Sequence, residues 1–473
     1  MLLALPLRAA DSLPDLGESS QTDMSPAMER RIGTSVMHEI RRDPAWLDDP
    51  EVYAYLNRLG SRLAAEVDES RQEFELFPLS DPTLNAFAMP GGFIGVHTGL
   101  ILAAESESEL ASVLAHEISH VTQRHLARLM SKSGQSQLSS IVGLAVAILA
   151  ARSNPDLAIG AAAAGQAAGI QQQLNYTRDF EREADRIGLS LLERSNFDIR
   201  GMSAFFERLQ KFGRLYENNA PGYLRTHPLT TERLSDLGNR IQNRPYRQVV
   251  DSLEFQLVRA KLRAQQGTAR DAVTEFESRL KDRKFAGSEL AVRYGLAQAL
   301  LRDGKAAAAE RELATLLRLK TAAGNSPMIE TLAALLRQKQ GDAPGAIKIL
   351  RAAQVRYPQE RAIAYGLVES LLEARQPQDA LRAISDDLMI YTSDARMHAL
   401  QARTYSVLGQ RLQQHRAQAE AYALEGQLSA AIEQLTLAQK AGDGNFYEQS
   451  QVDARLREFN RRLDEEKTLK KVR

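Results

Sequence analysis

The chain has 473 residues, which is more than one ordinary hydrophobic core supports and predicts two or three domains. Its 60 Lys and Arg balance its 60 Asp and Glu, so no positive field gathers a polyanion and nucleic-acid binding is not expected. The chain has no cysteine. Disulfides, Cys-ligated zinc and thiol nucleophiles are therefore excluded, and His, Asp and Glu are left as the ligands of any metal.

The first ten residues, MLLALPLRAA, form a short apolar run followed by a polar stretch with Pro and Gly. We interpret residues 1–10 as the remnant of a secretory signal whose basic start and full apolar length are not present, with a frayed terminus as the alternative. The longest apolar run elsewhere, residues 141–151, is shorter than the ~20 residues that span a bilayer. At most a peripheral membrane contact is expected.

The segment LNAFAMPGGFIGVHTGLI predicts two short strands turned at Pro90, Gly91 and Gly92. The strand from Phe93 to His97 is expected to be a sheet edge, to which the extended backbone of a peptide substrate adds as a further strand. A helix is then predicted from Ser106, whose spacing to the glutamate three residues later fits a capping box.

The motif HEISH, residues 116–120, lies on this predicted helix, whose apolar periodicity continues to residue 130. Residues four apart lie ~40° apart around a helix, so His116 and His120 can face one metal ion. Glu117 projects close enough to take a proton from a zinc-activated water without ligating the metal. Chance gives ~0.01 such motifs in a chain of this composition, which favours a zinc hydrolase over two ordinary histidines.

A catalytic zinc site needs a third protein ligand. His125 would lie on the opposite side of a continuous helix and is expected at the surface. A second helix is predicted around RDFEREADRIG, residues 178–188, in which Glu181 and Asp185 share a face and Glu183 points away. Glu181 can complete a His-His-Glu site, and Asp185 can hold the free nitrogen of a ligating imidazole. The alternative is an ordinary solvated acidic face.

HEISH followed by EREAD resembles the gluzincin peptidases that include HtpX and Oma-type proteases, whose pattern is HExxH and then ExxxD. The resemblance spans essentially the whole chain, and within this family it is strongest to the periplasmic beta-barrel assembly-enhancing proteases. It implies one Zn²⁺ per chain bound by His116, His120 and Glu181, with Glu117 as the catalytic base and Asp185 as a supporting residue.

The family also has a histidine after the second helix, and His227 in the sequence THP matches it. The resemblance implies that His227 approaches the metal and acts in catalysis, either as a stabiliser of the tetrahedral oxyanion or as a fourth ligand in a resting state. The sequence leaves both roles open, and a capping or loop histidine is the alternative.

The second half of the chain contains an internal repeat. Small residues and a turn position recur every 37 and then every 34 residues, at Gly267, Gly304, Gly341, Arg375 and Gly409, with a last unit at Gly426. A glycine that closes the first helix of a hairpin at this period is typical of stacked helix–turn–helix units, and the pattern resembles tetratricopeptide repeats. Such repeats form a curved solenoid that binds peptides or proteins, and plain helical hairpins without a partner are the alternative.

The expected fold class is α+β and mostly α: a zincin-type metallopeptidase domain with a small edge sheet at residues 11–245, then an all-α tetratricopeptide-like solenoid at residues 246–473. Residues 131–174 are expected to form a helical hairpin or lid beside the cleft, with an ordinary core hairpin as the alternative.

These features and the resemblance predict a zinc endopeptidase, with chaperone activity left open, acting in the periplasm on unfolded or misassembled outer-membrane proteins. The solenoid would dock onto the outer-membrane beta-barrel assembly machinery. One alternative is a non-proteolytic chaperone or scaffold that docks there through the same solenoid; Glu117 argues against it, because a pseudoenzyme does not need a base. A cytoplasmic peptidase is a further alternative if the N-terminus is genuine.

Overall fold

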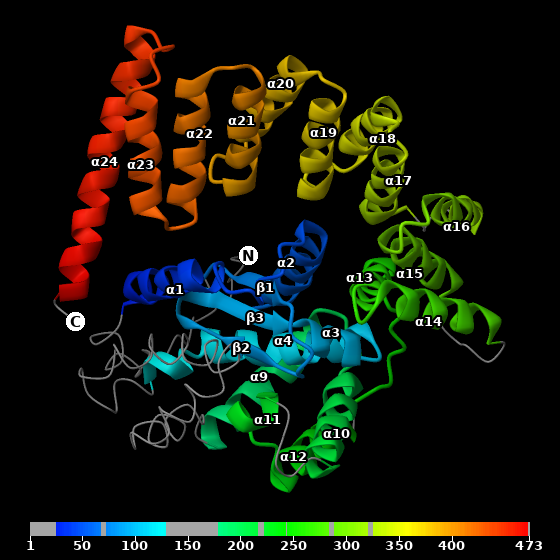
Figure 1. Cartoon of the computed structure of the whole chain (residues 1–473). Coiled ribbons are helices and arrows are strands. Elements are labelled where there is room, and N and C mark those ends of the chain that lie inside the picture. The colour runs from blue at the N-terminus through cyan, green and yellow to red at the C-terminus, as the bar shows by residue number, and fades with distance from the viewer. Residues whose placement is uncertain are drawn as a thin grey trace, which may run out of the picture.

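The computed structural model describes residues 25–67, 72–128, 178–215, 222–242, 244–282, 288–319 and 325–471. The predicted signal remnant and the predicted hairpin or lid at residues 131–174 lie outside these ranges. The expected fold class is confirmed, because helices dominate and the described ranges contain one three-stranded sheet (Figure 1). Among the helices of these ranges, none combines the length and hydropathy needed to cross a membrane.

The sheet consists of β1 (Glu75–Leu79), β2 (Ala86–Ala88) and β3 (Phe93–His97) in the order β1-β3-β2. β2 and β3 are antiparallel and joined by the turn at Pro90–Gly92, where Gly91 has a φ of 79°, so the predicted hairpin is confirmed. The expected edge position of β3 is wrong. β1 pairs with β3 in parallel, so β3 is the central strand and β2 is an edge strand.

Helices cover the sheet and frame the site: α1 (Pro26–Ile40), α2 (Pro50–Ala64), α3 (Thr98–Ala103), α4 (Glu107–Thr122), α9 (Arg178–Arg194), α10 (Arg200–Leu215), α11 (Gly222–Thr226) and α12 (Thr231–Gln242). α4 is the central helix, packed against α2, α9, α10 and β2, and its residues 107–121 are all buried. Ser106 caps it as predicted, by accepting the backbone N–H of Glu109. α4 ends at Thr122, well before the predicted residue 130.

The second half is a series of antiparallel helices: α13 (Leu253–Ala264), α14 (Ala269–Lys281), α15 (Glu289–Arg302), α16 (Ala306–Leu319), α17 (Pro327–Lys339), α18 (Ala343–Arg356), α19 (Arg361–Glu373), α20 (Pro377–Leu388), α21 (Ala395–Val407), α22 (Arg411–Leu424), α23 (Leu428–Gln439) and α24 (Phe446–Lys471). The predicted repeat is confirmed at the turns. The backbone adopts a left-handed conformation, with φ from 55° to 77°, at Gly267, Gly304, Gly341, Arg375, Gly409 and Gly426.

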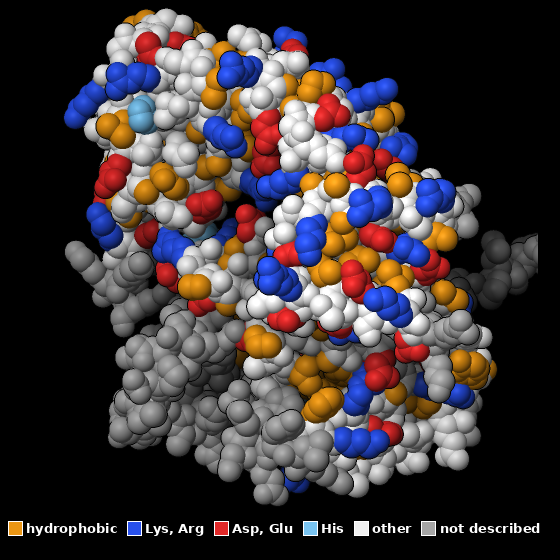
Figure 2. All heavy atoms as spheres, turned by 45° about the vertical axis from the view of Figure 1, so that its right-hand side comes forward, with side chains coloured by type: hydrophobic (Ala, Val, Ile, Leu, Met, Phe, Trp, Pro, Cys, Tyr) orange, Lys and Arg blue, Asp and Glu red, His pale blue; other side chains and the backbone are white. Residues whose placement is uncertain are grey.

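The solenoid forms an arc around the α1 and α2 side of the first half (Figure 1). α13 packs against α2 and α3, and at the far end Arg42 after α1 donates to the backbone carbonyl of Gly426 at 3.0 Å. One hydrophobic core continues from α2 and the sheet into α13–α17. The predicted domain boundary at residue 245 falls in the segment between α12 and α13 and stays a prediction. On the face in Figure 2, basic and acidic side chains are interspersed with apolar ones.

Candidate metal centre

The site is built where α9 packs directly on α4. Gly188 in α9 makes this approach possible, because a Cβ at this position would lie 3.1 Å from the backbone nitrogen of His116. The close packing places the first turns of α9 beside the HEISH motif. Glu181 and Asp185, one turn apart on α9, therefore both face α4, as the helical spacing predicts.

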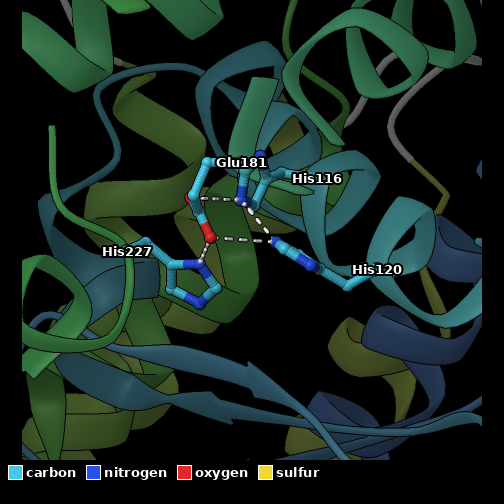
Figure 3. Close-up of side chains that lie close together, drawn as sticks. All are labelled: His116, His120, Glu181 and His227. Atoms are coloured by element: carbon cyan, nitrogen blue, oxygen red, sulfur yellow. Dashed lines mark hydrogen bonds and ion pairs between the residues drawn. The ribbon is translucent and has the colours of Figure 1, made fainter. Parts of the chain in front are cut away.

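Four side chains converge at this point: His116 and His120 from α4, Glu181 from α9, and His227 from the loop after α11 (Figure 3). All four are buried, and their ligand atoms lie within 4.8 Å of one another. His116 Nε2 and His120 Nε2 are 3.0 Å apart, and each lies 3.5 Å from one oxygen of Glu181. The structure thus brings the three predicted ligands together with His227, the predicted fourth member of the site.

The separations among His116, His120 and Glu181 fit three ligands of a tetrahedral metal ion. Bonds of about 2.0–2.1 Å to zinc place neighbouring ligand atoms about 3.3 Å apart in a tetrahedron. The separations of 3.0 Å between the nitrogens of His116 and His120, and of 3.5 Å from each nitrogen to Glu181, match that spacing. Three imidazoles and one carboxylate are also the nitrogen and oxygen donors that zinc accepts in proteins.

His227 contacts both the ligand cluster and the predicted base. Its Nδ1 lies 3.0 Å from Glu181 Oε1, and its Nε2 lies 3.5 Å from Glu117 Oε1. The ring is stacked on Tyr223 of α11 with the centroids 4.7 Å apart. His227 is therefore a buried member of the site and not an ordinary loop histidine.

Glu117 lies beside the cluster without belonging to it. Its side chain is fully buried, and its contacts among the described residues include His227 Nε2 at 3.5 Å and the backbone of Ala88 in β2. Burial raises the pKa of Glu117, and the nearby imidazoles of His227 and His116 oppose that rise. A buried carboxylate with a raised pKa is suited to accept and return a proton.

Asp185 supports the site from behind. Its Oδ1 lies 3.0 Å from Nδ1 of His116, the ring nitrogen that faces away from Glu181. Burial alone would lower the pKa of His116, but hydrogen bonds to Asp185 and Glu181 and the charges of these carboxylates raise it to about 9. Burial likewise works against the charge of Asp185, whose pKa is nevertheless lowered by its bonds to His116 and Arg233.

Arg233 in α12 is a site residue that the sequence did not reveal. Its guanidinium is 3% exposed and binds both oxygens of Asp185, at 2.7 and 2.8 Å, and one oxygen of Glu181 at 2.7 Å. It also donates to the carbonyl of Pro228, which fixes the loop that carries His227. No spacing rule pointed to it, because the contact joins two helices 48 residues apart in the chain.

The surface position predicted for His125 is also wrong. His125 is fully buried, not at the surface, and its Nδ1 lies 2.8 Å from Nδ1 of His120. The prediction assumed a continuous helix, but α4 ends at Thr122 and the chain turns at Arg124, which has a φ of 51°. This left-handed residue folds the next turn back against the motif.

The chain matches two family models: Peptidase family M48 over residues 50–241 and Tetratricopeptide repeat over residues 338–404. It is 33% identical to the beta-barrel assembly-enhancing protease of Escherichia coli K12 over 452 residues, which cover 95% of this chain and 91% of that protein. The Vibrio cholerae putative beta-barrel assembly-enhancing protease is 38% identical over 60% of this chain and 59% of that one. The mitochondrial metalloendopeptidase OMA1 of Arabidopsis thaliana is 29% identical over 45% and 38%.

Proposed function

Since the chain belongs to the beta-barrel assembly-enhancing proteases of peptidase family M48, we propose that it is a zinc endopeptidase acting on unfolded or misassembled outer-membrane proteins in the periplasm. The observation that carries the proposal is the buried cluster of His116, His120, Glu181 and His227 beside the buried carboxylate of Glu117. The E. coli relative is a beta-barrel assembly-enhancing protease, which supports a substrate class connected with beta-barrel assembly.

His116, His120 and Glu181 would hold the ion, with Asp185 and Arg233 fixing their orientation from behind. A bound zinc supplies Lewis-acid polarisation of the scissile carbonyl and lowers the pKa of a bound water. Glu117 takes the proton of the attacking water and passes it to the leaving amine, which its raised pKa favours.

The substrate would add to β2, the edge strand nearest α4. β2 is hydrogen-bonded to β3 on one side, and no described strand pairs with its other side. It packs against α4, so a peptide extended along β2 would run past Glu117. Binding through backbone groups explains how a protease of unfolded chains works with little sequence specificity.

We assign His227 as a fourth ligand in the resting enzyme. Its Nδ1 already lies 3.0 Å from Glu181 Oε1, inside the ligand cluster, so it occupies the position that a water needs for catalysis. A shift of the loop between α11 and α12 would open that position. The solenoid, which contacts α1 and α2, would receive clients or the outer-membrane assembly machinery.

Zinc analysis and a cleavage assay on an unfolded outer-membrane protein test the proposal. Glu117→Gln should keep about one zinc per chain and lose hydrolysis, because the residue acts on the water and not on the metal. Glu105→Gln, an exposed carboxylate just before α4, is the matched control and should cleave normally.

Three results would contradict the proposal in different places. Full cleavage by Glu117→Gln would remove this residue from the role of base. Absence of zinc from the wild type would refute the metal centre. A zinc-loaded wild type that prevents aggregation of the client but never cleaves it would favour the chaperone or scaffold function.

A further inference from the structure

Behind the ligand cluster, a line of hydrogen bonds connects His120 with partly exposed side chains at the protein surface. His120 Nδ1 lies 2.8 Å from Nδ1 of His125, and His125 Nε2 lies 3.0 Å from Oε2 of Glu183. Glu183 in turn accepts a hydrogen bond from Arg128 at 2.9 Å. The two histidines are fully buried, whereas the side chains of Glu183 and Arg128 are 27% and 39% exposed.

The proton positions in this line follow from its chemistry. A carboxylate paired with Arg128 is ionised and only accepts, so His125 must present a proton on Nε2. A neutral imidazole carries one proton, so Nδ1 of His125 is an acceptor. The 2.8 Å contact then requires that Nδ1 of His120 donates.

This assignment leaves Nε2 of His120 without a proton, so its lone pair points into the ligand cluster. That nitrogen is the one within 3.5 Å of Glu181 and 3.0 Å of Nε2 of His116, at the centre of the ligand cluster. Glu183, which contacts His120 through His125, thus determines which nitrogen of His120 carries no proton and can bind a metal.

Backbone geometry and ring stacking hold His125 in this line of hydrogen bonds. Arg124 adopts a left-handed backbone conformation to bring His125 back toward α4, and its guanidinium is held by Glu29 at 2.6 and 3.0 Å. The His125 ring is stacked on Phe180 with the centroids 4.5 Å apart and the planes at 12°.

We propose that His125 and Glu183 are positioning residues that lock His120 in the Nδ1–H tautomer and fix its ring, so that the metal-binding nitrogen is ready before an ion arrives. The inference rests on the proposed zinc centre. Residues that orient a metal ligand typically change metal affinity by 10–100-fold when they are removed.

Two substitutions at one position separate this role from simple packing. His125→Phe keeps an aromatic ring stacked on Phe180 but has no polar atom, whereas His125→Gln loses the ring but can accept from His120 and donate to Glu183. The proposal predicts that zinc affinity falls about 10–100-fold in His125→Phe and stays closer to wild type in His125→Gln. Packing alone predicts the reverse order.

Glu183→Gln tests the far end of the line with little change of shape. It should weaken zinc binding, because the amide does not dictate where the proton of His125 lies. Asp179→Asn, one turn earlier on α9 and exposed, is the control and should bind zinc as the wild type does.

The measurements are zinc affinity by chelator competition on the full chain and ¹⁵N spectra of its histidines without metal. The wild type should show His120 in the Nδ1–H form, and His125→Phe should show a mixture of tautomers. Equal affinity of His125→Phe and wild type, or weaker binding by His125→Gln than by His125→Phe, would overturn the inference. A wild type that binds no zinc would refute the proposed function instead.

Discussion

At the scale of single residues, the metal-free site carries a proton that an incoming ion must displace. Although burial opposes it, Asp185 and Glu181 raise the pKa of His116 to about 9. Because this value exceeds the ordinary histidine pKa of about 6.5, the proton stabilises the metal-free fold fully below pH 6.5. That contribution is lost as the pH rises through about 9.

Zinc binding is therefore expected to release about one proton per chain at a pH near 7.5, where His116 of the metal-free protein is still protonated. Calorimetric titration in two buffers of different ionisation enthalpy measures this number. The released proton should disappear above about pH 9. Zinc binding without proton release at neutral pH would mean that His116 is neutral before the ion arrives.

The role of His227 is decided by the sign of one substitution. If His227 occupies the fourth position at rest, His227→Ala should retain zinc on three ligands and raise basal proteolysis, including self-cleavage. If it stabilises the oxyanion, kcat should fall about 10²–10³-fold with zinc retained. We expect the increase; a variant inactive on every unfolded substrate would contradict it.

The sequence predicted the site residues that are related by helical spacing. His116, His120, Glu181 and Asp185 are related by the helical period, and that period alone places each pair on one face. Arg233 was missed because its contact depends on how α9 and α12 pack. The surface position predicted for His125 was wrong because the left-handed turn occurs at an arginine, Arg124, and not at a glycine that would have indicated it.

At the scale of elements, the solenoid turns share one backbone requirement. A left-handed residue closes a helix and reverses the chain, which glycine allows without a steric cost. Arg375 meets the same requirement with a side chain, at a φ of 56°. The repeat spacing predicted a turn at this position, even though arginine stands where the other units have glycine.

Arg375→Gly should therefore stabilise the protein by about 1 kcal/mol, because the left-handed conformation costs a side-chain-bearing residue about that much. Gly341→Ala is the mirror experiment. It should destabilise by a similar amount, since no atom lies within 4 Å of the added Cβ and only the backbone matters. Urea denaturation followed by circular dichroism measures both, and a destabilised Arg375→Gly would show that the arginine side chain contributes more than its backbone costs.

In the sheet, the local hairpin was predicted from the sequence, whereas the pairing with a distant strand was not. The hairpin of β2 and β3 was evident from the turn residues, because both strands and the turn are contiguous. The parallel partner β1 joins β3 across a connection with no local signal, and it converts the expected edge strand into the central one. Pairing between distant segments is set by tertiary packing, which short-range patterns do not encode.

At the scale of the whole molecule, the solenoid and the first half are fastened by charge as well as by a shared core. Lys261 of α13 reaches across to α2, where its ammonium lies 2.6 Å from both Asp49 and Glu51. Arg58 of α2 makes the complementary contact with Glu254 and Glu360 of the solenoid. These ion pairs fix where the solenoid lies relative to α2, in addition to holding it there.

Lys261→Met should cost about 3 kcal/mol of unfolding free energy, because it leaves two carboxylates that are only 8% exposed without their cation. Lys281→Met is the control: its pair with Glu277 is exposed, so the change should be within about 0.5 kcal/mol. Urea denaturation can be followed at Trp46, the single tryptophan, which is stacked on Phe77 in the first half, and by circular dichroism of all helices. Because one core continues through α13, both signals should shift together. A shift in circular dichroism with Trp46 unchanged would show that the two halves unfold independently, and the solenoid could then move on the peptidase without disturbing its fold.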